Sequence, residues 1–377
     1  MKIIADENIS FAAEAFSKFG TVELMHGRKI TRSSLMDAKA LVVRSITNVN
    51  KDLLDGTPVK FVGTATIGTD HIDVQYLDDH NITFTDAKGC NADAVTEYVF
   101  TALINIAVKY GITLAGKTMG IVGVGNIGTR VARYAHELGL SVLKNDPPLQ
   151  RKTGSSEFVP LDEVLKADFI TFHVPLNKGG EDNTIHLLDK EKLELIKEGT
   201  VLINASRGPV VDNTALQDII SRKKIYTVLD VWENEPELNI SLLNKVEIAT
   251  PHIAGYSLEG KVNGTKIIYD ALCRFSGFKN IWVPEMPAAD FNIIEYNAAG
   301  DIAEDLNNMF SEVYDIRHDN KELKKMLWMP ENERASYFDT LRKNYPLRRE
   351  FLNYKVIFKD GNNNVKELLS KFRFRVE

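Results

Sequence analysis

The chain has few cysteines, no long apolar run and no overall excess of positive charge. Cys90 and Cys273 are its only cysteines; they are too few for a disulfide framework and do not have the spacing of a metal site. The most apolar long stretch, residues 98–108, lies between Glu97 and Lys109 and is too short to span a bilayer. We therefore expect a cytoplasmic protein of a reducing compartment, with no metal site and no membrane partner.

Internal repeats and low-complexity segments are also missing, and the opening residues MKIIADEN indicate a strand and a polar loop rather than a signal peptide. The formal net charge of −6 does not favour nucleic acid as a partner. The charge is uneven, because residues 321–377 carry a net +6 and the remainder −12. Residues 341–350 (LRKNYPLRRE) include four basic side chains. This stretch is consistent with a nucleic-acid patch, a solvated helix face or a site for a small anion.

With 377 residues, 44% of them hydrophobic and 26% charged, the chain is expected to form two or three globular domains. Short apolar runs alternate with helical segments, which predicts an α/β fold with parallel sheets. The predicted strands are residues 2–5, 40–43, 60–63 and 82–85, followed by 118–125, 140–146, 168–175, 200–208, 225–233 and 246–252. A helix over 92–110 has one apolar face, made by Val95, Val99, Ala102, Leu103 and Ile106. After about residue 282 the pattern changes to helices at 300–316 and 319–328 and a strand at 354–358, an α+β region.

A glycine motif, GVGNIG at residues 123–128, follows an apolar strand and begins an amphipathic helix. A second strand then ends at Asp146, 18 residues after Gly128, which is close to the spacing of a dinucleotide-binding fold. Gly123 would permit the turn, Gly125 would let backbone N–H groups approach a pyrophosphate, and Gly128 would let helix and strand pack closely. The Asp146 carboxylate would bind both ribose hydroxyls and repel a 2′-phosphate, which favours NAD over NADP.

Three further polar residues each follow a different predicted strand: Arg207, Glu235 and His252. They could converge at one edge of the sheet. A histidine can take the proton of a substrate hydroxyl, an arginine can bind a carboxylate through two parallel hydrogen bonds, and a glutamate can orient the imidazole. Taken singly, each has an ordinary structural explanation: a capping histidine, a surface arginine and a turn glutamate.

The stretches GIVGVGNIG, TFHVPL, LINASRGPVVDN, LDVWENEP and TPHIAGY together resemble the D-isomer-specific 2-hydroxyacid dehydrogenase family, over residues 1 to about 280. This resemblance implies two Rossmann-like, doubly wound domains with NAD bound between them. It also implies the catalytic set Arg207, Glu235 and His252, with His252 as the acid/base. The implied cofactor contacts are Gly123, Gly125, Asn126, Ile127, Gly128, Asp146, His173, Ala205, Ser206, Arg207, Asp230 and Gly255.

The family resemblance implies a discontinuous substrate-binding domain, residues 1–93 and 256–282, and an NAD domain at 94–255. Narrower stretches resemble one branch of the family along essentially the whole chain: MKIIADEN, LVVRSIT, FVGTATIGTDHID, KGCNADAVTEYV, NDPP, HIAGYSLEGK and LRKNYPLRRE. Enzymes of that branch oxidise a phosphorylated four-carbon 2-hydroxy acid on the route to pyridoxal 5′-phosphate. By this resemblance residues 283–377 form an α+β dimerisation domain, and Ser45, Thr66 and Tyr256 contact the substrate.

Such a substrate has two anionic ends, and Arg207 can hold only the carboxylate. Arg44, which follows the predicted strand 40–43, is a candidate for the phosphate, with a simple surface charge as an equally weighted alternative. Arg342 or Arg348 of the basic stretch would complete the site. We expect a homodimer in which the tail of one subunit reaches the substrate cleft of its partner.

Three other functions are consistent with the sequence. The chain could be another enzyme of the same family, such as a 3-phosphoglycerate dehydrogenase. It could also be a non-catalytic NAD(H)-responsive binding protein, as the related transcriptional corepressors are. Nucleic-acid binding is the third and weakest alternative, because the chain is acidic and has no recognised binding module.

Overall fold

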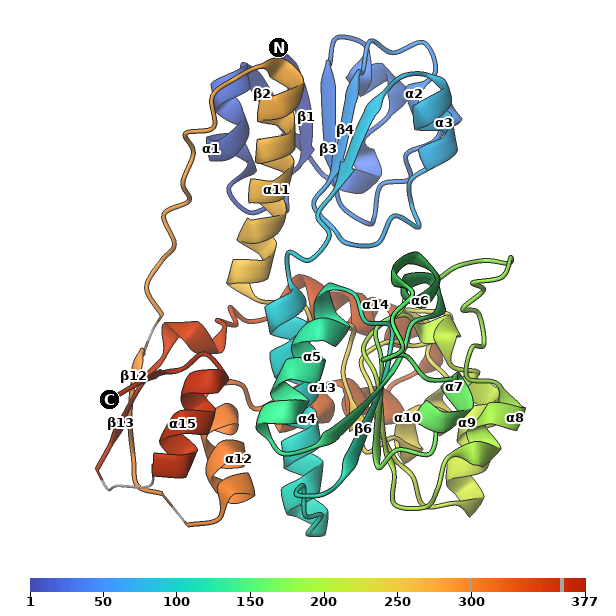
Figure 1. Ribbon diagram of the computed structural model, residues 1–377. Helices are drawn as coiled ribbons and strands as arrows, with labels where there is room; N and C mark the ends of the chain where they lie inside the picture. The colour runs from blue at the N-terminus through green and yellow to red at the C-terminus, as the bar shows by residue number, and fades with distance from the viewer. Residues whose placement is uncertain (290, 299, 360–362) are drawn as a thin grey trace. The chain divides into compact units, whose positions relative to one another are not determined.

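Two parallel β-sheets, each in its own structural unit, form the framework of the chain (Figure 1). The computed structural model describes residues 1–289, 291–298, 300–359 and 363–377. The first unit consists of residues 1–91 and 257–288, and the second of residues 92–256 and 289–377. The C-terminal region therefore belongs to the same unit as the segment that carries the glycine motif. Within the described residues, no helix is long and apolar enough to cross a membrane.

The first unit has a five-stranded parallel sheet in the order β2-β1-β3-β4-β5. Its strands are β1 (Lys2–Asp6), β2 (Thr21–Met25), β3 (Ala40–Val43), β4 (Phe61–Thr64) and β5 (Thr83–Asp86), and its α-helices are α1 (Ala12–Phe16), α2 (Lys51–Leu54), α3 (Val74–Asp79) and α11 (Leu258–Ser276). Four of the five strands match the predicted ones to within a residue. The sequence analysis did not identify β2, because it is an edge strand whose residues are mostly exposed or half-buried and show no apolar run.

The second unit has a six-stranded parallel sheet in the order β11-β10-β9-β8-β6-β7. Its strands are β6 (Thr118–Val122), β7 (Ser141–Asn145), β8 (Phe169–Phe172), β9 (Val201–Asn204), β10 (Tyr226–Leu229) and β11 (Ile248–Ala249). Lys144 of β7 also forms a parallel bridge with Phe158, so a further strand is reduced to one bridge beside β7. With that bridge included the order is that of the doubly wound dinucleotide fold, in which ligands bind beyond the carboxyl ends of the strands next to the reversal point.

The helices of this sheet are α4 (Ala92–Tyr110), α5 (Asn126–Glu137), α6 (Pro147–Thr153), α7 (Leu161–Val164), α8 (Lys190–Leu195), α9 (Asn213–Arg222) and α10 (Ile240–Lys245). Each predicted strand of this series begins within a few residues of an observed one, but the observed strands end earlier. The predicted ranges had included the polar loops that follow the strands, and these loops carry the site residues.

The C-terminal region forms a small parallel sheet in the order β12-β13-β14, with helices packed beside it (Figure 1). Its strands are β12 (Ile293–Tyr296), β13 (Lys355–Phe358) and β14 (Arg375–Val376), and its helices are α12 (Ile302–Val313), α13 (Ile316–Lys324), α14 (Glu331–Lys343) and α15 (Asn363–Lys371). The predicted helices and late strand are present, within boundaries shifted by a few residues, and the fold class is confirmed.

Helix α4 is buried on more sides than its sequence pattern predicts. Besides the predicted apolar face, Glu97, Phe100 and Thr101 are also buried. Phe100 packs edge-on against Phe372 of the C-terminal region, with ring centroids 5.3 Å apart. The C-terminal region therefore covers the face of α4 that the pattern assigned to solvent.

Candidate active site

The loops that follow β9, β10 and β11 carry Arg207, Glu235 and His252. These three strands are neighbours in the sheet, and all run parallel, so their carboxyl ends lie along one edge. His252 Nδ1 lies 2.8 Å from Glu235 Oε2. The second carboxylate oxygen, Glu235 Oε1, accepts a hydrogen bond of 2.8 Å from the backbone N–H of Trp232. Both oxygens of Glu235 thus have defined partners.

The charge state of Glu235 decides which nitrogen of His252 carries its proton. Burial raises the pKa of Glu235, but the charge and hydrogen bond of His252, the Trp232 N–H and the charge of Arg342 outweigh burial, and the net pKa is lowered. Glu235 is therefore a carboxylate at neutral pH and can only accept hydrogen bonds. His252 Nδ1–H must be the donor, which leaves Nε2 to accept a proton from another group.

The backbone of His252 is in the left-handed region, with φ of 57°. Asp230 holds this conformation from one side. Its main-chain oxygen accepts the His252 N–H at 2.7 Å, and its carboxylate accepts the N–H groups of Ile253 and Ala254 at 2.8 and 2.9 Å. Asp230 is 1% exposed and also accepts a hydrogen bond from the Thr250 hydroxyl. The residue expected to contact NAD is therefore already the main support of the loop that carries His252.

Arg207 lies directly before a close approach between two of these loops. A Cβ on Gly208 would come within 1.9 Å of the Trp232 carbonyl oxygen, so the Arg207 loop lies against the loop that leads to Glu235. The guanidinium of Arg207 donates from Nη1 to the Ser206 carbonyl at 2.8 Å. The Ser206 side chain is turned inward and donates to Asn204 Oδ1 at 2.8 Å. Of the expected contacts at 205–207, Ala205 and Arg207 are half-buried, whereas Ser206 is buried and supports the turn.

The glycine motif has the geometry that its three glycines predict. Gly123 has φ of 88°, and a Cβ there would lie 2.7 Å from the His173 carbonyl oxygen. A Cβ on Gly128 would lie 2.0 Å from the Gly123 oxygen, whereas a Cβ on Gly125 would meet nothing within 4 Å. Gly125 is the N-cap of α5, so the first turn of that helix, with Asn126 and Ile127, presents backbone N–H groups beside open space.

Asp146 lies at the end of β7 and supports this loop. Its Oδ2 accepts the Val124 N–H at 2.8 Å, and its Oδ1 caps helix α6 through the Leu149 N–H at 2.9 Å. The half-buried carboxylate therefore lies next to the glycine motif, where an adenosine ribose would be expected.

His173 follows β8, the other strand at the reversal point of the sheet. Its Nε2 lies 3.0 Å from the Thr171 hydroxyl, and its Nδ1 is buried with no hydrogen-bond partner among the described residues. Burial lowers the pKa of His173 to about 3, so the ring is neutral at physiological pH.

The basic stretch 341–350 does not act as one cluster. Arg342, in the last turn of α14, has its guanidinium carbon 5.9 Å from the Tyr256 ring centroid, and its buried Nε has no partner among the described residues. Burial lowers the pKa of Arg342, but attraction to Tyr256 and Glu235 outweighs it and the net pKa is raised. Arg342 is thus close enough to Glu235 of its own chain for their charges to interact. Gly255, before Tyr256, is half-buried in the same loop.

Arg348, which was expected to offer an anion site, is instead a structural residue. It is 7% exposed and its Nη2 donates to the carbonyl oxygens of Ala254 and Ala94, at 2.5 and 3.3 Å. The expectation was wrong because the chain leaves α14 at Lys343 and enters the interior before Arg348. Arg349 is buried as well, whereas Lys343 is exposed.

The remaining predicted substrate contacts belong to the first unit. Arg44 and Ser45 follow β3, Thr66 follows β4, and these strands are adjacent, so the three residues lie at the same end of that sheet. The Thr66 hydroxyl is 2.7 Å from that of Thr64. Ser45 is exposed; Arg44 is half-buried, and its guanidinium makes no ion pair among the described residues.

One supporting residue, His186, has no motif that would reveal it in the sequence. His186 Nε2 lies 2.6 Å from Glu233 Oε1, and its backbone N–H donates to the Pro209 carbonyl at 2.7 Å. His186 thus joins the loop after Arg207 to the loop before Glu235. Its Nδ1 faces Asp212 Oδ2 at 3.8 Å. One potential ligand atom from each of His186, Asp212 and Glu233 lies within 4.8 Å of the others, and His186 Nε2 is already within hydrogen-bond distance of Glu233.

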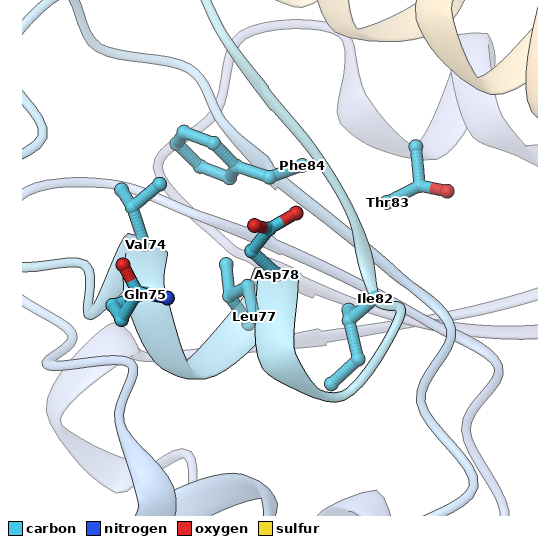
Figure 2. A pocket seen from close by; sticks show the side chains of 7 residues that line it. All are labelled: Val74, Gln75, Leu77, Asp78, Ile82, Thr83 and Phe84. Atoms are coloured by element: carbon cyan, nitrogen blue, oxygen red, sulfur yellow. The ribbon is translucent and has the colours of Figure 1, made fainter.

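Figure 2 shows a hollow in the first unit that is separate from these residues. It is lined by α3, β5 and the turn between them: Val74, Gln75, Leu77, Asp78, Ile82, Thr83 and Phe84. Asp78 is the only charged residue in this lining. The hollow therefore does not suit an anionic substrate.

Comparisons with known proteins identify both parts of the chain. Residues 94–254 match the family model described as D-isomer specific 2-hydroxyacid dehydrogenase, NAD binding domain. Residues 286–372 match a model described only as a domain of unknown function. The chain is 46% identical to erythronate-4-phosphate dehydrogenase of Proteus mirabilis, over 95% of each chain. It is also 46% identical to that of Escherichia fergusonii, over 99% of this chain and 98% of the relative.

Solved structures show the same fold. The D-lactate dehydrogenase from Aquifex aeolicus, complexed with NAD and lactic acid, is 26% identical with a TM-score of 0.60, over 74% of this chain and 96% of that one. A 3-phosphoglycerate dehydrogenase from Entamoeba histolytica with bound NAD is 23% identical with a TM-score of 0.63, over 74% of this chain and 95% of that one.

Proposed function

The chain belongs to the erythronate-4-phosphate dehydrogenases of the D-isomer-specific 2-hydroxyacid dehydrogenase family, and from this membership we propose that it oxidises 4-phospho-D-erythronate. The product is 2-oxo-3-hydroxy-4-phosphobutanoate, NAD is the acceptor, and the reaction serves pyridoxal 5′-phosphate biosynthesis. The observation that carries this proposal is the His252–Glu235 pair, with the cation Arg342 close enough to interact electrostatically with Glu235.

Bound NAD would supply the hydride acceptor for C2 of the substrate. The residues proposed to hold it are Gly125, Asn126 and Ile127 at the start of α5, Asp146 at the ribose, and His173, Ala205, Arg207, Asp230 and Gly255 around the nicotinamide end. Gly125 supports the fit, because the space a Cβ would occupy is open. Gly123, Gly128 and Ser206 shape the loops that carry these groups.

His252 Nε2 takes the hydroxyl proton as the hydride leaves. Its Nδ1–H remains bonded to Glu235, whose negative charge stabilises the imidazolium that forms. No other change of protonation is needed in this step. The reverse reaction returns the proton from Nε2 to the oxygen of the 2-oxo acid.

The two anionic ends of the substrate require separate cations. Arg207 is proposed for the carboxylate, and Arg342, Arg44, Ser45 and Thr66 for the rest of the molecule, with Tyr256 beside Arg342. Arg342 lies close to Glu235 of its own chain, which supports its use within one subunit. The earlier expectation that a tail reaches the partner's cleft is therefore not required for this residue.

The alternatives are less well supported. A 3-phosphoglycerate dehydrogenase would not be expected to share 46% identity with erythronate-4-phosphate dehydrogenases along 95% of each chain. A non-catalytic NAD(H)-responsive protein would have no need of the oriented His252–Glu235 pair. Nucleic-acid binding loses its main support, because two of the four basic residues at 341–350 are buried.

We also propose the domain roles expected from the sequence: residues 1–93 and 256–282 bind the substrate, 94–255 bind NAD, and 283–377 mediate homodimerisation. Exposed apolar side chains in the C-terminal region support a partner surface there, namely Phe291, Ile293, Trp328 and Leu347. A cytoplasmic location fits the two free cysteines, both of which are buried.

The proposal is tested by following NADH formation with 4-phosphoerythronate and with non-phosphorylated erythronate. We expect the phosphorylated acid to be preferred by at least about a hundredfold in kcat/KM, since a missing charge-assisted phosphate contact costs several kcal/mol. His252→Ala should lower kcat by about 10²–10⁴. No turnover of either acid by the intact chain would overturn the proposed activity.

Arg342 is tested in the same assay. Arg342→Met should raise KM for the phosphorylated acid at least about tenfold and leave KM for NAD unchanged. The reason is that the substitution removes from the enzyme one charged group that would hydrogen-bond to the substrate. Lys343→Met is the matched control, since Lys343 is the adjacent basic residue of the same helix and is exposed. Equal substrate KM values in the two variants would exclude Arg342 from the site.

A further inference from the structure

We propose that Arg348 is a positioning residue for catalysis: the C-terminal region uses it to clamp, within one chain, the loop that carries His252. The kinetic part of this inference rests on the proposed function. The clamp assigns a task to a region that the family comparison describes only as a domain of unknown function. This task differs from dimerisation and from binding the substrate.

The loop needs support because its backbone conformation is unfavourable. His252 is a non-glycine residue at φ 57°, a conformation that costs about 1 kcal/mol outside glycine. Oxygens of Asp230 accept hydrogen bonds from the N–H groups of residues 252–254. These acceptor oxygens cannot bind the carbonyl oxygens of the same loop. The carbonyl oxygen of Ala254 requires a separate donor, and Arg348 Nη2 supplies it at 2.5 Å.

Arg348 also connects this loop to the start of helix α4, through the carbonyl oxygen of Ala94 at 3.3 Å. Its guanidinium lies over the Tyr314 ring, 4.5 Å from the centroid, which stabilises the buried charge. Tyr314 in turn donates to Asp319, which also accepts the Tyr345 hydroxyl. Arg348 is thus held by groups of the C-terminal region on one side and by the loop on the other.

Placing an arginine in the interior is costly, and simple packing does not require one. Arg348 is 7% exposed, and its Nη1 has no hydrogen-bond partner among the described residues. A buried cation with an unused donor lowers stability relative to an apolar side chain of the same size. Attraction to buried Glu97 and Asp319 compensates part of its charge. Its direct hydrogen bonds nevertheless go to the two carbonyl oxygens, so we infer that the guanidinium is retained for the geometry of the His252 loop.

Loss of the clamp should affect the chemical step more than binding. With Ala254 unsupported, the peptide groups after His252 can rotate, and the imidazole no longer stays aligned with the substrate hydroxyl. A displacement of about 1 Å in a catalytic group can reduce the rate by about a hundredfold. Arg348 does not hydrogen-bond the glycine motif or Arg342, but Gly255 and Tyr256 follow Ala254 in the same loop. Cofactor and substrate affinity should therefore fall, but by a smaller factor than kcat.

The experiment compares Arg348→Met and Arg348→Lys with the control Arg349→Met in the full-length chain. Arg349 is the adjacent buried arginine, and its Nη2 donates to Asn353 within the C-terminal region. We expect Arg348→Met to lower kcat by about ten- to a hundredfold, and to raise KM for substrate and Kd for NADH by a smaller factor than the fall in kcat. Arg348→Lys should regain part of kcat, and Arg349→Met should keep kcat within about twofold.

Hydrogen–deuterium exchange gives a second readout that does not depend on turnover. Arg348→Met, or Arg348→Lys if the Met variant does not fold, should speed exchange at the amides of residues 252–256 but not at those of 119–125. Equal kcat in Arg348→Met and Arg349→Met, or unchanged exchange at 252–256, would overturn the clamp. Failure of the wild-type chain to oxidise the phosphorylated acid would overturn the proposed function but leave the exchange test of the clamp intact.

Discussion

At the scale of single residues, the site depends on how a few buried polar groups share their hydrogen bonds. Glu235 uses one oxygen for His252 and the other for the Trp232 N–H, so its position and charge are both defined. Asp230 uses both oxygens to hold the His252 loop. Sequence motifs can nominate these residues, but they cannot separate the group that orients the imidazole from the group that holds its backbone.

His173 gives a prediction about pH. Burial lowers its pKa to about 3, whereas a histidine in the unfolded chain titrates near 6.5. Between these values the unfolded state binds one more proton than the folded state, so this residue lowers the free energy of unfolding as pH falls from 7 to 4. We expect His173→Gln to gain stability relative to the wild type over that range, as measured by urea unfolding at pH 7, 5.5 and 4.5.

The control for this prediction is His136→Gln, which changes an exposed histidine on helix α5. Its stability relative to the wild type should vary much less between pH 7 and 4.5. If the two variants had the same pH dependence, His173 would not be the source of the acid sensitivity.

At the scale of secondary-structure elements, the loop between β6 and α5 shows three glycines with three separate physical roles. Gly123 is needed for its positive φ, and Gly128 for the close contact with the Gly123 oxygen. Gly125 has an ordinary φ of −78° and borders open space, so neither strain nor packing inside the protein accounts for it. A ligand that approaches the backbone does account for it.

Substitutions of two of these glycines should separate folding from cofactor binding. Gly125→Ala should keep or slightly raise stability, by up to about 1 kcal/mol, but raise the Kd for NADH at least about tenfold. Gly128→Ala should lower the free energy of unfolding by about 1–3 kcal/mol, because its Cβ would overlap the Gly123 oxygen. Urea unfolding and fluorescence titration with NADH measure the two effects. Unchanged NADH affinity in Gly125→Ala would contradict the assigned cofactor position.

Asp146 connects two elements, and its charge can be tested apart from its capping role. Asp146→Asn keeps Oδ1 as the acceptor for the Leu149 N–H but replaces Oδ2, the acceptor for the Val124 N–H, with an NH2 donor. The free energy of unfolding should therefore fall by about 1–3 kcal/mol. Removing the negative charge should lower the preference for NAD over NADP, because a 2′-phosphate is no longer repelled. The ratio of the kcat/KM values for NAD and NADP measures this preference. An unchanged ratio in Asp146→Asn would mean that another group sets the preference.

At the scale of the whole molecule, the C-terminal region is part of the unit that carries the catalytic pair. It covers α4, brings Arg342 beside Glu235, and provides Arg348 to the His252 loop. The same region exposes large apolar side chains, and Trp328 is 89% exposed in the single chain. One region therefore has an inner surface that supports the site and an outer surface suited to a second subunit.

We expect the chain to sediment as a homodimer, with Trp328 in or near the interface. Trp328→Asp should shift the protein toward the monomer in sedimentation velocity, because a charge replaces a large apolar contact. Met36→Asp is the control, since Met36 is an exposed apolar residue of the first unit. A monomeric wild-type protein, or a Trp328→Asp variant that dimerises as strongly as the wild type, would contradict this arrangement.

The sequence by itself determined the α/β class, most strands and the glycine motif, because these features depend on local patterns: apolar runs bounded by polar loops, and glycines at fixed spacing before a helix. The three catalytic candidates were nominated by the family resemblance of the motifs that contain them. Strand β2 was not identified because its edge position leaves no apolar run. The buried second face of α4 was not identified because its cover comes from residues more than two hundred positions away.

Only the tertiary structure decided the roles within the basic stretch 341–350. Arg342 and Arg348 have the same side chain and are six residues apart, so local composition could not separate them. The end of α14 turns the chain inward between them, and this turn leaves one guanidinium beside Glu235 and buries the other against the carbonyl oxygen of Ala254. A charge has its effect through its neighbours in space, and those neighbours come from distant parts of the chain.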